Sequence, residues 1–564
     1  MDNDAQAIAA ARNWLDRYPD NVPHEINPDE YRSLLDMFEQ SIVRFADKPA
    51  FSNLGRTLSY AEVDQLTRDF AAFLQKRLGL EQGDRIALMM PNLLQFPVAM
   101  FGAMRAGLVI VNTNPLYTER ELEHQMSDSG AKAIVVLENF AHMVEKVYGK
   151  TSLNHVIVTG AGDMLNIPKR WLVNFVLRYV RRQVPSYKIP GSTRLRAALV
   201  HGRLLKLDPV APGPNDIAML QYTGGTTGLS KGAVLTHRNL IANMLQLRAW
   251  LGVRLVEGEE VVITALPLYH IFSLTCNCLL FMSLGGLNVL ITNPRDMNAF
   301  LGEMKNWPFT ALTGVSTLFN LMLNHSLFKE IDFSHLRLAV GGGMSLQESV
   351  AGRWAEITGG FILEGYGLTE ASPVVCANPY TITGYTGAIG LPLPSTEVTL
   401  RDDDGKEAVT GELWVRGPQV MQGYWNREDA TTDTITSDGW LKTGDIAAWN
   451  DQGFLAIVDR KKDMIVVSGF NVYPNEVENV LMMHEGILEA ACVGVPDERS
   501  GEAVKVFVVL KPGVELEARD IKEHCKQQLT GYKVPRQVEF RDELPKTNVG
   551  KILRRALREP DAKL

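Results

Sequence analysis

The chain has 564 residues, of which 46% are hydrophobic and 22% charged, and its formal net charge is −8 at neutral pH. This length exceeds what one hydrophobic core normally serves, so we expect two or more domains. The acidic balance excludes a surface built mainly for nucleic acid, and five scattered cysteines without a CxxC or Cys/His cluster indicate reduced core thiols rather than a metal site.

The N-terminus carries acidic residues and no apolar segment typical of a secretory signal. No uncharged apolar stretch is long enough to span a membrane, because residues 276–292, which come nearest, are interrupted by Asn and Gly. We therefore expect a cytoplasmic protein that is soluble or only peripherally bound to a membrane.

Two regions, residues 57–137 and 261–343, alternate between helical and extended patterns. Apolar residues from Leu66 to Leu74 recur at helical spacing, and residues 96–106 predict a second helix. Short apolar runs predict buried strands, which cover residues 85–90, 108–111, 133–137, 261–263, 288–292, 309–312 and 337–340. Because strands alternate with helices, we expect parallel sheets in an α/β fold.

A basic segment stands out against the acidic background, because residues 169–206 contain ten Lys or Arg residues and no Asp or Glu. Within it, apolar residues from Trp171 to Val180 recur at helical spacing beside basic ones, a pattern typical of a basic amphipathic helix. This pattern indicates peripheral contact with the inner surface of the cell membrane. The alternative is a solvated basic helix that packs on the body of the protein.

The segment from Tyr222 to Gly232 reads YTGGTTGLSKG and follows an apolar run, residues 217–220, that predicts a buried strand. Glycines expose backbone N–H groups to phosphate oxygens, hydroxyls add donors, and Lys231 adds a positive charge. This composition indicates polyphosphate binding, with a flexible linker as the alternative. Lys231 lies between a serine and a glycine, which does not match a Walker A loop.

Between residues 397 and 454 the pattern changes to short β segments separated by Asp/Gly turns, which predicts a small sheet or barrel. Five consecutive charged residues, Asp459 to Asp463, follow, and an α+β pattern continues to the C-terminus. Because a charged run between two differently patterned regions suits a hinge as well as a solvated turn, we place the domain boundary there.

Six further short motifs follow the glycine-rich segment. They are residues 266–272 (LPLYHIF), 340–345 (VGGGMS), 364–370 (EGYGLTE), 439–446 (GWLKTGDI), 459–474 (DRKKDMIVVSGFNVYP) and 545–555 (PKTNVGKILRR). Together and in this order they resemble the acyl-adenylate-forming, or AMP-binding, superfamily, from residue 30 onward. Within it, residues 438–478 are most similar to the bacterial long-chain fatty acid–CoA ligases, the fatty acyl-CoA synthetases.

The resemblance implies an α/β protein in two parts. Residues 1–459 would form a large N-terminal domain of parallel α/β sheets that binds AMP and the acyl chain, with a small β-barrel-like subdomain at residues 397–459. Residues 460–564 would form a small, mobile α+β C-terminal domain. The expected enzyme uses ATP, Mg²⁺ and CoA: a long-chain fatty acid and ATP give acyl-AMP and pyrophosphate, and the CoA thiol then displaces AMP. The sequence is also compatible with a homodimer.

The resemblance assigns the β- and γ-phosphates of ATP to the glycine-rich segment. The residues concerned are Thr223, Gly224, Gly225, Thr226, Thr227, Gly228 and Lys231. Thr369 would contact the phosphate chain, and Glu370 would be the Mg²⁺ ligand. Since Mg²⁺ commonly keeps waters and substrate phosphates in its shell, one carboxylate suffices. The alternative for Glu370 is a plain carboxylate at a helix start.

The nucleoside is expected between two motifs. Asp445 would bind the ribose hydroxyls, because a carboxylate accepts two hydroxyl donors. Tyr366 would stack on adenine, with a core aromatic as the alternative. The glycines and the acid expected around the base are Gly341, Gly342, Gly343, Glu364, Gly365 and Gly367.

Lys551 resembles the mobile lysine of the family, which bridges the substrate carboxylate and the α-phosphate during adenylation. This lysine would occupy the position that the incoming thiol needs. In enzymes of the family, the C-terminal domain therefore rotates between the two half reactions. Lys462 matches the hinge position, and Arg460 would meet ribose or phosphate. Gly469 resembles the glycine that lets pantetheine pass, unless it is an ordinary hairpin glycine.

His270 resembles the residue that orients or gates the carboxylate, with a core histidine as the alternative. The uncharged residues 309–323 could line an acyl channel or belong to the core. Two other functions stay open. One is an acyl-AMP ligase that passes the acyl group to a carrier protein or another acceptor, although the SGFNVYP segment favours CoA. The other is a membrane-associated fatty acid-binding protein that uses ATP only as a regulatory ligand.

Overall fold

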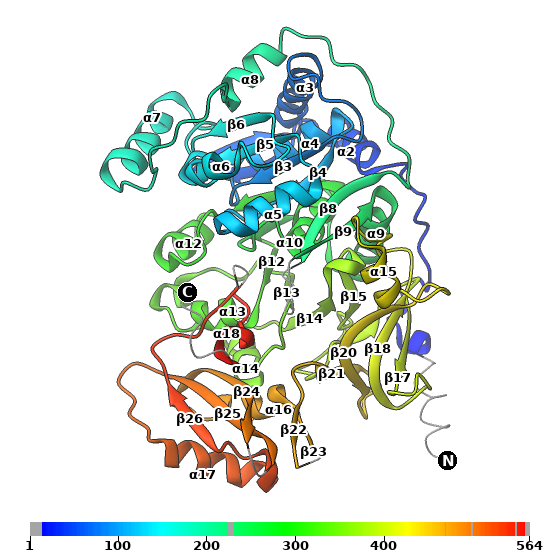
Figure 1. Ribbon diagram of the computed structural model, residues 1–564, viewed down its shortest axis with the longest axis vertical. Coiled ribbons are helices and arrows are strands. Elements are labelled where there is room, and N and C mark those ends of the chain that lie inside the picture. Colours follow the sequence, from blue (N-terminus) through cyan, green and yellow to red (C-terminus); the bar gives the residue numbers. More distant parts are fainter. Residues whose placement is uncertain (1–13, 224–229, 469, 498–499, 548–549, 559–564) are drawn as a thin grey trace.

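The structure of the protein is a computed structural model that describes residues 14–223, 230–468, 470–497, 500–547 and 550–558. Its parts are stacked along the long axis (Figure 1). Two α/β units with large sheets form the upper and middle layers, a smaller antiparallel sheet lies beside the middle layer, and a compact C-terminal unit occupies the lower end. This arrangement confirms the α/β class and the smaller C-terminal part.

The upper sheet has eight strands in the order β19-β9-β8-β4-β3-β5-β6-β7, and those from β8 to β7 run parallel. The strands are β3 (Arg85–Met89), β4 (Val109–Asn112), β5 (Ala133–Leu137), β6 (His155–Thr159), β7 (Thr193–Arg194), β8 (Ile217–Thr223), β9 (Lys231–Thr236) and β19 (Gly423–Tyr424). The helices of this layer are α3 (Tyr60–Lys76), α4 (Gln95–Arg105), α5 (Glu119–Ser129), α6 (Ala141–Val147), α7 (Ile167–Phe175) and α8 (Leu195–Gly202). The strands predicted in this region are confirmed.

The middle sheet has nine strands in the order β16-β15-β14-β13-β12-β10-β11-β1-β2, and those from β14 to β1 run parallel. The strands are β1 (Pro49–Asn53), β2 (Arg56–Ser59), β10 (Val261–Thr264), β11 (Leu287–Leu290), β12 (Ala311–Gly314), β13 (Leu338–Gly342), β14 (Ile362–Gly367), β15 (Val374–Ala377) and β16 (Leu391–Pro392). The helices are α2 (Leu34–Arg44), α9 (His237–Leu251), α10 (Ile271–Ser273), α11 (Leu280–Ser283), α12 (Met297–Met304), α13 (Ser316–Leu323) and α14 (Glu348–Thr358).

Local sequence signals explain where these elements begin. Ser59 and Glu62 form a reciprocal capping box at the start of α3, and each side chain accepts a bond from the backbone N–H of the other. The strand β3 is buried on both faces, as its continuous apolar run requires in a covered parallel sheet. The predicted strand at 309–312 lies instead at Ala311–Gly314, because Phe309 is buried without joining the ladder.

One core unites the two large sheets. The largest buried cluster contains side chains from both sheets and from α9. Trp250 of α9 is fully buried within it, and its indole N–H donates to the backbone oxygen of Asn378 (3.0 Å). The upper and middle layers therefore fold as one large body.

The β-rich segment forms an antiparallel sheet in the order β17-β18-β20-β21. Its strands are β17 (Glu397–Arg401), β18 (Thr410–Arg416), β20 (Leu441–Trp449) and β21 (Leu455–Arg460), and α15 (Glu428–Thr434) precedes β20. The C-terminal unit contains α16 (Pro474–Met482), α17 (Ala518–Gln528) and α18 (Arg554–Arg558). Its sheet consists of β22 (Ile465–Val467), β23 (Phe470–Val472), β24 (Ile487–Asp497), β25 (Gly501–Leu510) and β26 (Gln537–Phe540). A boundary at residue 459 stays a prediction.

Candidate active site

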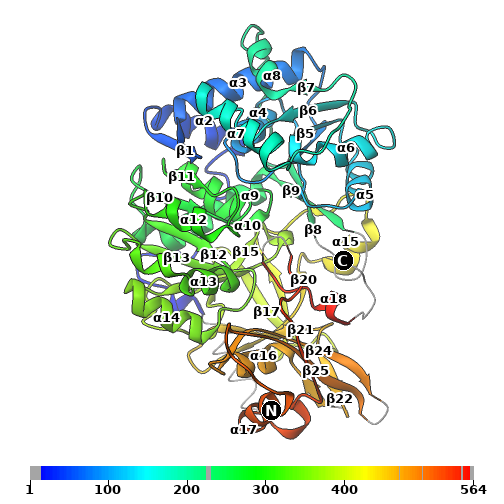
Figure 2. The same ribbon diagram turned by 90° about the vertical axis from the view of Figure 1, so that its left-hand side faces the viewer.

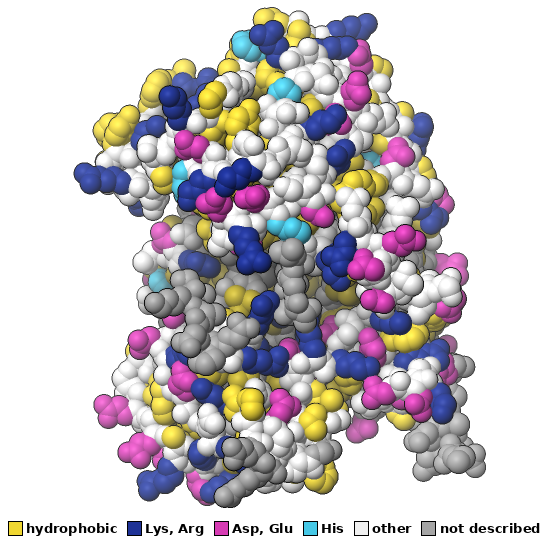
Figure 3. Space-filling view, in the orientation of Figure 1, with side chains coloured by type: hydrophobic (Ala, Val, Ile, Leu, Met, Phe, Trp, Pro, Cys, Tyr) yellow, Lys and Arg dark blue, Asp and Glu magenta, His cyan; other side chains and the backbone are white. Residues whose placement is uncertain are grey.

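Several of the predicted site residues lie together where the large body meets the C-terminal unit, among them Tyr366, Asp445, Arg460 and Lys462. In both ribbon views the last part of the chain, which includes α18, runs from the lower unit back toward the large sheets (Figure 1, Figure 2). Lys and Arg side chains gather around the hollow between these parts (Figure 3). The parallel strands β13 and β14 end there, as expected for a ligand site at the carboxyl edge of an open α/β sheet.

The glycine-rich segment connects two antiparallel strands. Thr223 at the end of β8 lies opposite Lys231 at the start of β9. The predicted residues Gly224, Gly225, Thr226, Thr227 and Gly228 lie outside the described part of the chain. After this segment, the carbonyl oxygen of Ser230 accepts a bond from His124 Nε2 (2.9 Å), which ties it to α5. The hairpin thus brings Thr223 and Lys231 together at one edge of the upper sheet.

Glu370 lies in a short helical turn, Thr369–Ala371, that begins just after β14. Tyr424 Oη donates to Glu370 Oε1 (2.6 Å), and the Lys231 ammonium lies 5.0 Å from the centre of the Tyr424 ring. A backbone bond from Met421 to the Glu370 carbonyl (2.8 Å) holds the two segments together. Glu370 and Lys231, which are far apart in sequence, therefore both contact one tyrosine, Glu370 at its hydroxyl and Lys231 at its ring.

Asp445 links the middle sheet to the four-stranded sheet. It is 6% exposed, its Oδ2 accepts from Tyr366 Oη (2.5 Å), and its Oδ1 forms an ion pair with Arg460 Nε (3.1 Å). Burial and the Asp445 charge raise the pKa of Tyr366, so its hydroxyl stays a donor. An open cavity of about 270 Å³ borders this group and is lined by Thr443, Gly444, Asp445, Arg460, Lys461 and Lys462.

The glycines of β13 and β14 lie side by side, with Gly341 opposite Glu364 and Gly342 opposite Gly365. Gly367 is required by a close approach, because a Cβ there would lie 2.1 Å from the carbonyl oxygen of Pro373. Gly343 has a φ of 78°, which favours glycine.

Glu364 is a buried acid on β14. Its Oε2 accepts from the backbone N–H of Leu346 (3.0 Å), and burial raises the pKa of its carboxyl to about 8. It is therefore mainly neutral at pH 7 and keeps a proton that it can donate.

Lys551 reaches the site from the C-terminal unit. Burial lowers the pKa of its ammonium to about 8, and the nearby Arg460 charge acts in the same direction. Its neighbour Gly550 touches the large body, where its carbonyl oxygen accepts from Thr317 Oγ1 (3.2 Å). A Cβ at Gly550 would lie 2.9 Å from that hydroxyl, and its φ is 83°, so a glycine is needed at this contact.

His270 lies at the start of α10, close to Lys551. Its Nδ1 accepts from the backbone N–H of Phe272 (3.3 Å), which places the proton of the neutral ring on Nε2. Burial lowers the pKa of His270 to about 4, and the Lys551 charge acts in the same direction. His270 is therefore a neutral donor at pH 7.

The predicted hinge residue Lys462 follows β21 and lines the cavity beside Asp445. Burial and Arg460 lower the pKa of its ammonium. Beyond it, β22 and β23 form the expected hairpin, with Val467 opposite Phe470. Gly469 itself lies outside the described residues.

The uncharged residues 309–323 contribute to a core. Phe319 of α13 is buried, and its ring packs on Trp354 with 5.0 Å between the centroids. Thr317 and Asn320 of the same helix contact the C-terminal unit. The core alternative for this segment is favoured, and a channel along it stays untested.

Sequence reasoning missed several contacts that complete the site. Tyr424, which meets both Glu370 and Lys231, comes from a strand of two residues without a motif. His124 and Asp128 of α5 contact the flanks of the glycine-rich segment, and Tyr222 Oη donates to Asp128 Oδ2 (2.6 Å). Arg554 was part of a quoted motif but received no role. These contacts join segments that are distant in sequence, so no local sequence pattern predicts them.

The fold and the site combine a large α/β body with a smaller C-terminal unit, and polar side chains such as Asp445, Arg460 and Lys462 line an open cavity there, as in a ligand-binding enzyme. The model of the AMP-binding enzyme family matches residues 38–425, and that of the AMP-binding enzyme C-terminal domain matches residues 476–551. The chain therefore belongs to the AMP-binding enzyme family.

Similar proteins share nearly the whole chain. A long-chain-fatty-acid–CoA ligase of Escherichia coli O157:H7 is 59% identical and one of Bacillus subtilis strain 168 is 37% identical; each match covers 97% of this chain and 98% of the relative. The crystal structure of the anthranilate CoA ligase AuaEII with anthranoyl-AMP has a TM-score of 0.83 at 26% identity, covering 94% of this chain and 98% of that one. ATP-bound MatB from Rhodopseudomonas palustris has a TM-score of 0.79 at 28% identity, with coverages of 93% and 98%.

Proposed function

We propose that this protein activates long-chain fatty acids with ATP and joins them to CoA, with acyl-AMP as the intermediate and AMP and pyrophosphate as products. The observation that carries the proposal is the docking of the Gly550–Lys551 turn on Thr317 of the large body, which buries the Lys551 ammonium where the charge of Asp445 acts on it, and Asp445 itself is bound to Tyr366 and Arg460. The relatives named as long-chain-fatty-acid–CoA ligases support the acyl class and the acceptor.

In the first half reaction, each site residue binds a different part of ATP or of the fatty acid. Asp445 binds the ribose hydroxyls while it still accepts from Tyr366, because a carboxylate offers about four acceptor positions. Thr223 and Lys231 hold the outer phosphates, and Thr369 contacts the phosphate chain. Lys551 supplies positive charge between the fatty carboxylate and the α-phosphate, where negative charge accumulates. The Nε2–H of His270 orients the carboxylate.

Glu370 is suited to supply the carboxylate ligand that Mg²⁺ needs. Among the described residues, no group of three or more His, Cys, Asp or Glu forms a metal cage. Mg²⁺ is usually held by one or two carboxylates together with waters and substrate phosphates. Since Glu370 Oε1 accepts from Tyr424, Oε2 would be the ligand oxygen. The bound ion would neutralise charge on the phosphate oxygens.

In the second half reaction, the C-terminal domain turns about Lys462. Lys551 leaves the α-phosphate, and the β22–β23 hairpin with Gly469 enters to admit the pantetheine arm of CoA. Arg460 borders the cavity beside Asp445 and contacts ribose or phosphate. One binding site thereby serves two reactions that need different groups at the same position.

The test is a product analysis with palmitate, a short acid and an aromatic acid, each with and without CoA. We expect AMP, pyrophosphate and palmitoyl-CoA, with palmitate favoured because each buried methylene contributes about 0.8 kcal/mol. Acyl-AMP that accumulates without any thioester would point to another acceptor, such as a carrier protein. ADP and phosphate as products would refute the proposal.

We propose, in addition, that the protein contacts a membrane surface through α7 and the π-helical turn Val176–Val180 that continues it. Trp171 and Phe175 are 68% and 55% exposed, and Leu172, Tyr179 and Val180 are exposed beside them. Apolar and basic side chains lie together over this region (Figure 3, upper left). Arg178 is held by Glu138 (2.6 Å), whereas Lys169, Arg181 and Arg182 are exposed to solvent.

This surface has the composition of a helix that lies in a lipid interface, with an apolar stripe and a basic rim. No helix in the described ranges is long and apolar enough to cross a bilayer. A peripheral contact would bring the enzyme to acids that dissolve in the membrane.

Sedimentation with vesicles tests this contact. The protein should bind phosphatidylglycerol vesicles better than phosphatidylcholine vesicles, and less at high salt, because the Debye length shortens. A Trp171→Asp, Phe175→Asp double variant should bind at least about tenfold more weakly. Val43→Asp is the control, since Val43 of α2 is 81% exposed and lies outside the patch. Equal binding by the double variant and the control would refute the contact.

A further inference from the structure

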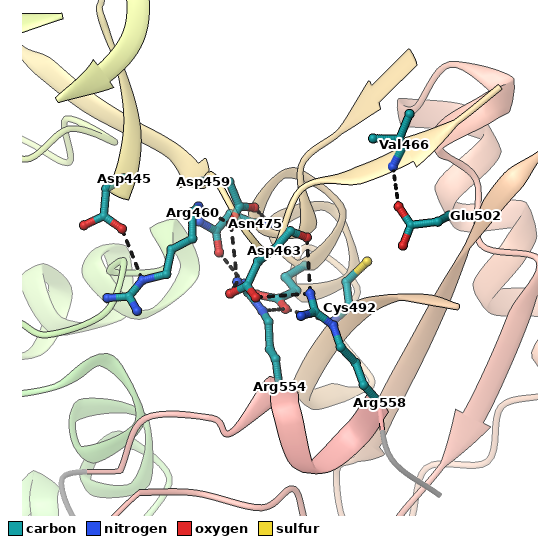
Figure 4. A network of polar contacts seen from close by, with 11 residues as sticks. Asp445, Asp459, Arg460, Asp463, Val466, Asn475, Cys492, Glu502, Arg554 and Arg558 are labelled. Atoms are coloured by element: carbon teal, nitrogen blue, oxygen red, sulfur yellow. Dashed lines mark hydrogen bonds and ion pairs between the residues drawn. The ribbon is translucent and has the colours of Figure 1, made fainter. Parts of the chain in front are cut away.

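Arg554 lies at the centre of a network of ion pairs (Figure 4). The proposed function gives this arginine no role. Its guanidinium forms a fork on Glu478, with Nε donating to Oε1 (2.9 Å) and Nη2 to Oε2 (2.6 Å). Nη1 lies 3.4 Å from Asp459 Oδ1 and 3.6 Å from Asp463 Oδ2. Three carboxylates therefore share one cation that is mostly buried.

These partners belong to two different parts of the protein. Glu478 of α16 and Asp463 follow the expected hinge residue Lys462 and move with the C-terminal unit. Asp459 precedes the hinge: it lies in β21, opposite Ile446 of β20, within the four-stranded sheet. The Arg554–Asp459 contact therefore crosses the hinge, whereas the Arg554–Glu478 fork does not.

Asp459 depends on groups from beyond the hinge. Its side chain is fully buried, its Oδ2 accepts from the backbone N–H of Asn475 (2.9 Å), and its Oδ1 accepts from the N–H of Arg460 (2.7 Å). Burial raises the pKa of its carboxyl to about 6, while Arg554 acts in the opposite direction. A rotation about Lys462 would remove Arg554 and Asn475 together and leave this carboxylate with only the backbone N–H of Arg460.

The same arginine follows Lys551 closely in the chain, with only Ile552 and Leu553 between them. The backbone N–H of Lys551 donates to Thr547 Oγ1 (3.1 Å), and that of Thr547 donates to the Lys551 carbonyl (2.6 Å), so Lys551 ends a tight turn. This turn leads straight into α18, whose first residue is Arg554. Holding Arg554 against β21 therefore holds the Lys551 ammonium at the site.

We propose that Asp459 and Arg554 form a latch across the hinge that holds the C-terminal domain with Lys551 at the α-phosphate. Both are positioning residues that act through Lys551. The latch must open before thioester formation, while the Glu478 fork keeps Arg554 paired in both states. The inference rests on the proposed function, because it needs a domain that turns between two half reactions.

Asp459→Asn tests the latch. The amide keeps the size of the side chain and can still accept from Arg460, but it removes the charge that attracts Arg554. Since Arg554 keeps Glu478 and Asp463, no buried cation is left unpaired. We expect palmitate-dependent ATP–pyrophosphate exchange to fall roughly tenfold, with thioester formation from supplied palmitoyl-AMP and CoA unchanged or faster, because the domain equilibrium shifts.

Glu489→Gln is the matched control. Glu489 pairs with Lys546 inside the C-terminal unit, close to the same turn, but this pair does not cross the hinge. Both half reactions should stay within about twofold of the wild type. Should Asp459→Asn fail to fold, Arg554→Lys replaces it, because one ammonium cannot span Glu478 and Asp459; the same shift between half reactions is expected.

The outcomes separate the latch from the proposed function. A wild-type protein without palmitate-dependent exchange would refute the proposed function itself. With an active wild type, equal loss of both half reactions in the Asp459 variant, or exchange at the wild-type level, would overturn the latch. A purely structural role would lower both half reactions together and would not change their ratio.

Discussion

Replacement of Lys551 by alanine should abolish palmitate-dependent ATP–pyrophosphate exchange and spare thioester formation from supplied palmitoyl-AMP. The buried Lys551 ammonium lies where Asp445 and Arg460 affect its pKa, and the proposed function places it where charge develops on the α-phosphate. Removal of one preorganised donor of this kind costs about 10²- to 10³-fold in rate. In the proposed mechanism thioester formation follows the turn of the C-terminal domain, so it should not need this side chain.

Lys546→Ala is the control for this experiment. It removes a cation from the same end of the chain, but one that pairs with Glu489 inside the C-terminal unit. Its two half reactions should both stay close to those of the wild type. If Lys551→Ala slows thioester formation as much as adenylation, the lysine does not have the assigned role.

The pH dependence of adenylation gives a second readout of the same group. The cation is the active form and burial lowers its pKa to about 8, so kcat/KM for exchange should be full below this pH and fall as the pH rises through it. In Lys551→Arg the part of this fall that comes from the lysine should be absent, because a guanidinium stays charged, and any fall that remains would belong to Glu364, whose pKa is also about 8. Thioester formation should lack this fall in both proteins.

The sequence predicted the sheets well because burial in a parallel sheet leaves a local trace. The apolar runs at β3, β5 and β10 have the length of a strand and end at polar or turn residues. Strand ends were less certain, as at β12, because hydrogen-bonded partners from distant parts of the chain decide which residues join the ladder.

The site was predicted as a set of motifs, but its geometry was not. Tyr366 and Asp445 belong to different sheets, and only the packing of these sheets brings the phenol within 2.5 Å of the carboxylate. The tautomer of His270 follows from a backbone N–H that the sequence does not place. The pKa values of Lys551 and Glu364 depend on burial, which is a property of the assembled chain. The same holds for Arg554: the sequence motif shows a positive charge at this position, but it does not show which carboxylates pair with it.

Glu370→Gln should lower the rate of adenylation by about 10²-fold or more and raise the Mg²⁺ concentration needed for half-maximal exchange. The substitution keeps the shape of the side chain and the bond from Tyr424, but it removes the negative charge that a hard divalent cation prefers. Tyr424→Phe leaves the carboxylate in place and removes only the hydroxyl that orients it, so its Mg²⁺ requirement should shift by about tenfold at most.

Comparison of Glu370→Gln with Tyr424→Phe shows whether Glu370 is a metal ligand or a structural carboxylate. If Glu370 only anchored Tyr424, Glu370→Gln would keep this bond and would have no larger effect than Tyr424→Phe, and neither variant would change the Mg²⁺ requirement. Glu428→Gln makes the same chemical change on an exposed acid of the neighbouring α15 and should leave exchange unaltered. Because supplied palmitoyl-AMP bypasses the step in which the triphosphate is cleaved, thioester formation should be insensitive to Glu370→Gln. A loss there equal to the loss in exchange would show that Glu370 supports the fold of the site rather than the metal.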